Sequence, residues 1–363
     1  MKKTFLLMGI AALAFASCAK DTVSEINNGR AIDFRVATET RATETTVTNL
    51  TSFNVTAISA AETDEGDIEE TANNYFEDVL FSVHGTAGEE GAYFVSSPAY
   101  YWPEVDGLNF YAYAPTSLKA LVTINNTSKS ATNFTPAVKL CDQVDFVVAT
   151  AYGDNGDQEY GVALDFKHML SQIEIKAKNG DDRYVYTVAG VKIDGVYPTG
   201  TVVFTDPSAP IWTPSGNVYT YYVNYDAKVD ESGKATVEFP VLDETAQTLT
   251  LNETDLTVTE NAMLIPQNLA NLNAKAKLGV YVNVTSKTGV KVFPKTGDYG
   301  WKEVEIDTEW EHGYKYVYTL DLTTSLGEPI KFTTSVTGWD EQLIPEDNET
   351  PDPEDPTQDP EGE

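Results

Sequence analysis

The sequence predicts an all-β protein of two tandem antiparallel β-sandwich domains, followed by a disordered acidic tail. Runs of alternating apolar and polar residues recur about every ten to fifteen residues from residue 49 onward. Clusters of Gly, Asp, Asn and Pro separate these runs, as turns separate strands. The 20 Tyr and 15 Phe residues suit half-buried, pleated surfaces. Because no helical pattern is interleaved with the strands, antiparallel sandwiches are favoured over a parallel α/β sheet.

Residues 1–18 are predicted to be a lipoprotein signal peptide. A basic start, MKK, precedes the apolar run TFLLMGIAALAFA, which is too short to span a bilayer comfortably. The run ends in FASC, where Ala16 and Ser17 precede Cys18 in the lipobox pattern of bacterial lipoproteins, with Phe15 replacing the usual Leu. We expect the Cys18 sulfur to carry a lipid. The alternative is an ordinary signal peptide whose cysteine has no special role.

The second cysteine has no expected disulfide partner, and the net charge argues against one class of function, nucleic-acid binding. Lipidation of Cys18 leaves Cys141 without an intrachain disulfide partner, and its neighbours in AVKLCDQVDFVVAT predict a small buried residue in a strand. The formal net charge is -32, from 24 Lys and Arg against 56 Asp and Glu. This charge repels phosphate backbones and anionic lipid surfaces, which argues against nucleic-acid binding.

Residues 19–41 are predicted to be a propeptide, polar and rich in Thr and Glu. Only AIDFRV interrupts this composition. Its apolar residues Ile32, Phe34 and Val36 alternate with polar ones, as in one short strand. The alternative role for residues 19–45 is a plain tether.

Two sandwiches are expected between this segment and the tail. The N-terminal one, over residues 46–180, takes its strands from TNLTSFNVTAIS, YFEDVLFSVH, AYFVSS, LNFYAYAP, ALVTIN, DFVVATA and VALDFKHMLSQIEIKAK. The boundary is expected near residues 178–184, in the polar turn KNGDDRY. The C-terminal sandwich, over residues 181–340, takes its strands from DDRYVYTVAGVKIDGVY, GTVVFT, VYTYYVNYD, KATVEFPV, ENAMLIPQ, KLGVYVNVTS, YKYVYTLDL and IKFTTSVTGW, with a helical turn only in NLANLNAKAK.

Residues 341–363 are predicted to form the disordered tail. They have several prolines, no basic residue and almost no apolar content. Such a segment buries too little surface to offset its ordering entropy.

The sequence predicts no catalytic residue, no metal site and no cofactor. His84, His168 and His312 stand in no metal-ligand spacing, and a structural role is favoured for His168. Nucleophile-elbow, phosphate-loop and dinucleotide fingerprints are missing. YGDNGDQEYG lacks the EF-hand spacing, so a tight turn is favoured over a calcium site. A hydrolase with a carboxylate pair is the lowest-ranked alternative.

Two aromatic stretches leave a binding function open. YYWPEVDGLNFYAY and VYTYYVNY are rich enough in aromatic rings to form a sugar-binding platform, but their alternation favours packing in the core. The alternative function is therefore a permanently lipidated surface protein that binds glycans or host ligands through residues such as Trp102 and Tyr111.

Several segments, in order, resemble the fimbrillin family, the lipoprotein-precursor pilins of type V pili in anaerobic Gram-negative bacteria. The matching pieces cover roughly residues 1–340: FASC, TRATETTVTNLTSFNVTA, YYWPEVDGLNFYAYAP, LDFKHMLSQIEIKAKN, LIPQ, WEHGYKYVYTLDL and SVTGW. The resemblance implies two transthyretin-like sandwiches. It also implies a fimbrial subunit that acts at the cell surface in adhesion and biofilm formation.

The resemblance further implies processing by an Arg-specific, gingipain-like protease once the lipidated precursor has reached the outer membrane. Arg41, followed by Ala42 just before the first regular strand, is the expected cleavage site, and Arg35 is the alternate. Other fimbrial subunits are the expected partners, and the adhesion ligand is left open.

Assembly is expected to proceed by β-augmentation, in which an added strand fills a gap in a sandwich. The strand containing Ile32, Phe34 and Val36 is the expected plug that closes this gap before cleavage. After Trp339 only QLIP and the acidic tail remain, which would make a poor donor strand. A tip or accessory subunit is therefore favoured over a stalk subunit, although EPIKFTTSVTGW could itself be the donated strand.

Overall fold

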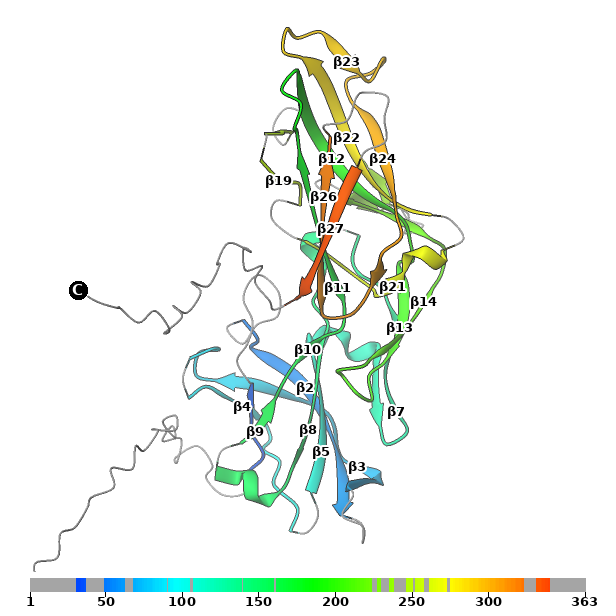
Figure 1. Cartoon of the computed structure of the whole chain (residues 1–363). Coiled ribbons are helices and arrows are strands. Elements are labelled where there is room, and N and C mark those ends of the chain that lie inside the picture. Colours follow the sequence, from blue (N-terminus) through cyan, green and yellow to red (C-terminus); the bar gives the residue numbers. More distant parts are fainter. Residues whose placement is uncertain are drawn as a thin grey trace, which may run out of the picture.

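The computed structural model describes residues 31–339 except 37–48, 63–67, 90, 105–106, 139, 160, 224–226, 230–234, 238–245, 251, 258–260, 273–274 and 323–330. The predicted all-β class is confirmed. The helical elements in this part of the chain are short 3-10 turns: η1 (Thr116–Ala120), η2 (Leu140–Asp142), η3 (Asn155–Glu159) and η4 (Leu269–Asn271). The strands form two lobes stacked end to end (Figure 1).

The N-terminal lobe is an eight-stranded sheet in the order β10-β8-β5-β2-β3-β4-β1-β9. All of its pairings are antiparallel except that of β1 with β9, which is parallel. The strands are β1 (Phe34–Val36), β2 (Ser52–Glu62), β3 (Ile68–His84), β4 (Tyr93–Ser96), β5 (Gly107–Ala114), β8 (Val147–Gly153), β9 (Val162–Leu164) and β10 (Lys167–His168).

The central strands of this sheet are covered on both faces, because successive apolar side chains point to opposite sides of the sheet. In β8, Val147 and Ala149 face one core, whereas Val148 faces another. In β5, Phe110 joins the first core and Tyr111 the second. Successive side chains of a strand point to opposite faces, so nearly continuous apolar runs such as DFVVATA produce two cores.

The second of these cores, the junction core, joins the two lobes. It lies beneath a four-stranded sheet ordered β14-β13-β7-β6, which takes two strands from each half of the chain. Its residues likewise come from both halves, with Phe134 and Phe146 packed beside Phe204 and Trp339. The strands are β6 (Val122–Asn125), β7 (Ser128–Phe134), β13 (Thr199–Val203) and β14 (Ile211–Ser215).

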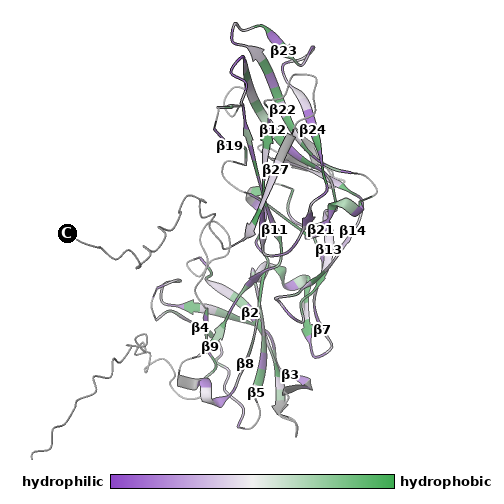
Figure 2. Cartoon of the chain, viewed as in Figure 1, coloured by the Kyte–Doolittle hydropathy of each residue, from purple (hydrophilic) through white to green (hydrophobic). Residues whose placement is uncertain are grey.

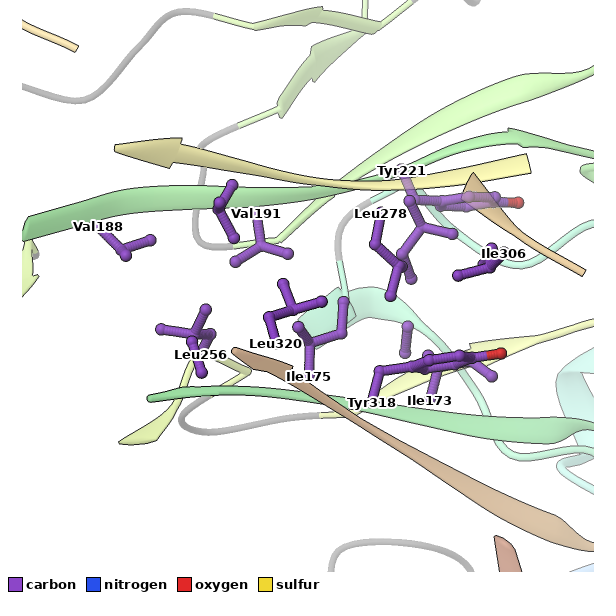
Figure 3. Packing of buried hydrophobic residues seen from close by; sticks show 14 of the residues in the cluster. Ile173, Ile175, Val188, Val191, Tyr221, Leu256, Leu278, Ile306, Tyr318 and Leu320 are labelled. Atoms are coloured by element: carbon purple, nitrogen blue, oxygen red, sulfur yellow. The ribbon is translucent and has the colours of Figure 1, made fainter. Parts of the chain in front are cut away.

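The C-terminal lobe is a sandwich of two sheets. One contains β11 (Ser171–Lys178), β19 (Thr254–Asp255), β20 (Ala262–Leu264), β26 (Tyr314–Asp321) and β27 (Lys331–Gly338). The other contains β12 (Tyr184–Val196), β15 (Tyr219–Val223), β18 (Gln247–Thr248), β22 (Ala276–Ser286), β23 (Lys291–Phe293) and β24 (Gly300–Ile306). Hydrophobic side chains from the two sheets interdigitate between them (Figure 3), and polar residues alternate with them along the strands (Figure 2). Two further ribbons pair β16 (Ala227–Val229) with β17 (Ala235–Val237) and β21 (Gln267–Asn268) with β25 (Glu309–Trp310).

Between residues 140 and 178 the structure differs from the sequence prediction. The sequence predicts one strand over residues 162–178, but the chain divides it into β9, β10 and β11, because Met169 and Leu170 turn into the junction core. Strand β11 then pairs in parallel with β26, a pairing that antiparallel hairpins do not predict. Cys141 lies in turn η2 rather than in a strand, because Gln143 N donates to Leu140 O at 2.9 Å.

Strand pairing crosses the predicted domain boundary. β11 precedes residue 180, yet its partners β19, β20 and β26 all follow it. The limits 46–180 and 181–340 stay a prediction. Within the described residues, no helix is long and apolar enough to cross a bilayer.

Candidate functional site

Residues 31–36 form part of the N-terminal sheet. Strand β1 lies between β4 and β9, with Phe34 opposite Phe94 on one side and Val162 on the other. Just before β1, Ile32 N donates to Tyr100 O at 2.8 Å, and Asp33 O accepts from Val162 N at 3.0 Å. The segment therefore completes a ladder that β4 and β9 do not make with each other.

The apolar side chains of this segment enter the first core. Ile32 is 2 % exposed and Phe34 is fully buried, while Val36 is half-buried against the same core. The Phe34 ring meets Phe81 and Phe110 edge-on, with centroid distances of 4.8 and 5.0 Å. Burial of the two larger side chains stabilises this lobe by about 3–6 kcal/mol.

Asp33 is an unusual residue for such a segment, because it is an acidic residue that is only 4 % exposed. Burial raises the pKa of this carboxyl to about 6, with the guanidinium of Arg35 acting weakly in the opposite direction. Gly161 lies against the carboxyl in a left-handed conformation, φ +69°, and a Cβ there would collide with Asp33 Oδ1. The site thus holds a carboxyl that is largely neutral below pH 6.

The two candidate cleavage residues differ in what the structure describes. Arg35 lies within β1, half-buried, in register with Ala163 of β9. Arg41 and Ala42 lie outside the described residues, as does the lipidation residue Cys18.

The residues considered for a sugar platform are packed in the protein. Trp102 is 4 % exposed and meets the Phe110 ring edge-on at 5.8 Å. Tyr111 is 8 % exposed, its hydroxyl donates to Glu70 at 2.6 Å, and Lys129 Nζ lies 4.8 Å from its ring centroid. These two residues therefore serve the cores, as the alternation of their strands predicts.

The acidic loop and the histidines have structural partners. Asp154 N donates to Asp157 Oδ2 and Gly156 N donates to Asp154 Oδ1, which closes the tight turn η3. His168 lies 2.9 Å from Asp145 and stacks on Trp339 with a centroid distance of 4.5 Å. Among the described residues, no group of three or more His, Cys, Asp or Glu could hold a metal ion.

The sequence reasoning missed a cavity of about 620 Å³ at the waist of the molecule. Its walls come from β14, from the β20–β21 segment and from the turn between β25 and β26. These three segments are far apart in the chain, and β14 and β21 lie side by side (Figure 1). Only the folded chain brings their Trp212, Tyr314 and Glu311 together.

Comparisons with known proteins found similar solved structures and one matching family model. The crystal structure of a fimbrial protein from Bacteroides vulgatus covers 86% of this chain and 100% of its own, with 19% identity and a TM-score of 0.61. A candidate cell adhesion protein from Bacteroides uniformis covers 85% and 97%, with 13% identity and a TM-score of 0.48. The fimbrial anchor protein Mfa2 from Porphyromonas gingivalis covers 85% and 98%, with 12% identity and a TM-score of 0.31.

At 19% identity, the likeness to the Bacteroides vulgatus protein shows the fold alone. No curated protein sequence matches this chain. A sequence model described as fimbrillin-like, however, matches residues 40–339, which is most of the chain and includes both lobes. The chain therefore belongs to the fimbrillin-like family of fimbrial proteins, as its ordered motifs indicate.

Proposed function

We propose that this chain is the precursor of a fimbrial subunit whose N-terminal lobe is closed by residues 31–36 until a protease cuts after Arg41. The precursor is lipidated at Cys18 and held at the outer membrane. After the cut, a strand from a neighbouring subunit fills the vacated position. The assembled fimbria serves adhesion and biofilm formation at the cell surface.

The position of β1 is the observation that carries this proposal. β1 is the strand between β4 and β9, so its departure would leave the backbone N–H and C=O groups of both neighbours without partners. It would also uncover the rings of Phe81 and Phe110. An incoming strand with alternating apolar residues can restore the ladder and the burial together, so the exchange needs no external energy source.

Cleavage after Arg35 is disfavoured because this residue is paired within β1. Arg35 is held in a strand with ladder partners on both sides, and a protease needs an extended, unpaired substrate. A cut after Arg41 would leave the whole of β1 on the released side.

The strand nearest the C-terminus, β27, is already paired within its own chain. It ends the C-terminal sheet, pairs with β26, and is anchored at its end by Trp339. Within the described part of the chain, β27 is therefore not free to be donated to a neighbour. The acidic residues beyond Trp339 would make a poor donor, so we propose a tip or accessory subunit.

The test is an Arg41→Ala variant expressed in a cell that assembles these fimbriae. We expect a lipidated precursor that keeps its N-terminus and does not enter polymers, whereas the matched Arg35→Ala variant is cut and polymerises. N-terminal sequencing and a polymer ladder on a gel provide the readout. Normal polymers from Arg41→Ala, or a wild-type surface protein that begins at Cys18, would contradict the mechanism. The second result would favour the permanently lipidated binding protein instead.

A further inference from the structure

The waist cavity has the size and the walls of a ligand site. Its volume of about 620 Å³ lies within the range of small-molecule pockets. It is lined by Ala209, Pro210, Trp212, Pro214, Pro266, Gln267, Asn268, Glu309, Trp310, Glu311, His312 and Tyr314.

One wall is apolar and rigid. Trp212 and Pro214 are two residues apart in β14 and so present their side chains on one face of that strand, and Pro210 lies just before it. The Trp212 ring lies over Gly200, where a Cβ would come within 2.9 Å of it, and its Nε1 donates to Met169 O at 2.8 Å. Across the cavity, Tyr314 is 41 % exposed. Two aromatic rings therefore face a space that is open to solvent.

Three side chains of the cavity donate their hydrogen bonds inside the protein. Trp310 Nε1 donates to the Tyr318 hydroxyl at 2.9 Å. The Gln267 amide donates to Tyr197 O and Ile265 O, at 3.2 and 3.1 Å. With the indole of Trp212 also bonded inward, these groups hold the walls in place rather than bind a ligand.

The charged groups left to a ligand are two carboxylates. Glu309 and Glu311 are exposed at the cavity, and within the described part of the chain neither has a Lys or Arg partner. Among the described residues that line the cavity, none is Lys or Arg. Burial lowers the pKa of His312, so its ring is neutral at pH 7.

We propose that this cavity binds an organic cation, an ammonium or guanidinium group carried on an apolar stem. Such groups have several N–H donors and no acceptor, which complements a site that offers two carboxylates and holds the donors of Trp212, Gln267 and Trp310 inside the protein. The rings of Trp212 and Tyr314 can take the cation or its stem through cation–π contact and burial. The net charge of -32 attracts cations over a longer range. A Lys or Arg side chain of a partner protein and a free polyamine share this chemistry. The site does not depend on cleavage or strand exchange.

Calorimetric titration of the full chain at low ionic strength tests the proposal. The probes are acetyl-Gly-Arg-Gly-amide, the same peptide with neutral citrulline in place of Arg, spermidine, and the neutral sugar maltotriose. We expect the Arg peptide to bind at least about tenfold more tightly than the citrulline peptide. The double variant Glu309→Gln/Glu311→Gln should remove that preference, and Tyr314→Ala should weaken the Arg peptide severalfold.

Glu305→Gln is the matched control, because Glu305 is an exposed carboxylate on β24 outside the cavity. It should leave the affinity unchanged, which separates the cavity from the general negative charge of the surface. Arg-peptide binding without spermidine binding identifies a protein side chain as the source, and tighter spermidine binding identifies a polyamine. Equal affinity for the citrulline peptide, binding of maltotriose alone, equal weakening by Glu305→Gln, or no binding of either cationic probe would overturn the proposal.

Discussion

Asp33 makes the closure of the N-terminal lobe depend on pH. Asp33 is buried just before β1, and the pKa of its carboxyl rises from 3.8 to about 6 on folding. The folded state therefore binds this proton more tightly than the unfolded state, so the contribution of Asp33 to stability is greatest below pH 3.8 and is lost as the pH rises through 6. Asp33→Asn should be more stable than the wild type at pH 7.5, by about 1–2 kcal/mol once solvent screening is allowed for, and equal to it near pH 4.

Urea unfolding of the two proteins between pH 4 and pH 8 measures this difference in free energy. The control is Glu77→Gln, since Glu77 is exposed on β3 of the same sheet. Its difference from the wild type should stay flat across the range. An Asp33→Asn difference that is also flat would show that the Asp33 carboxyl is not desolvated in the folded protein.

At the scale of single elements, β27 pairs with β26 along its whole length, and Trp339 anchors its end. Trp339 is 5 % exposed, its N donates to Gly313 O at 2.8 Å, and its ring stacks on His168 in the junction core. Trp339→Ala should lower the free energy of unfolding by about 3–5 kcal/mol and speed hydrogen exchange across β27. Val336→Ala, at a residue that is 49 % exposed, should change stability by no more than about 0.5 kcal/mol. Unchanged exchange in Trp339→Ala would mean that β27 is held by its ladder with β26 alone.

Most strands of this fold could be predicted, because their alternation records which face is buried. Strand β22 follows a clear pattern of this kind, whereas β5 is buried along nearly its whole length and is predicted by its continuous apolar run. β7 and β14 are missed, since SKSATNF is polar and Pro214 interrupts IWTPS. The helical turn predicted in NLANLNAKAK is confirmed in part. Asn268 caps the short turn η4, whereas Ala276 and Lys277 already belong to strand β22.

The candidate sites also differ in how far the sequence alone predicts them. Ile32 and Phe34 could be placed on a buried strand because a three-residue alternation is local information. The partners β4 and β9 could not be predicted, because nothing local in AIDFRV specifies a parallel neighbour more than a hundred residues away. The waist cavity was out of reach for the same reason. Its three walls meet only through the tertiary fold.

For the whole molecule, the junction core makes the two lobes one mechanical unit. The sheet that covers it takes β6 and β7 from one half and β13 and β14 from the other. The same core holds Trp339, at the end of the last described strand. A load applied along a fibre would therefore pass through packed side chains and not through a single linker.

Net charge should limit the rate at which this chain associates with another acidic fimbrial subunit. The full sequence carries a formal charge of -32. A cut after Arg41 removes six Lys and Arg and four Asp and Glu, so the cut chain carries -34, and the residues after Trp339 contribute only acidic groups to that total. Raising the salt concentration from 0.01 to about 0.15 M shortens the Debye length from roughly 30 to 8 Å, which screens the repulsion between subunits. Light scattering of protein cut after Arg41, mixed with an acidic subunit that supplies a donor strand, should therefore show association that is severalfold faster at the higher salt, and a variant lacking residues 341–363 should show a smaller salt effect. Slower assembly at higher salt would mean that attraction between opposite charges, rather than apolar strand exchange, brings the subunits together.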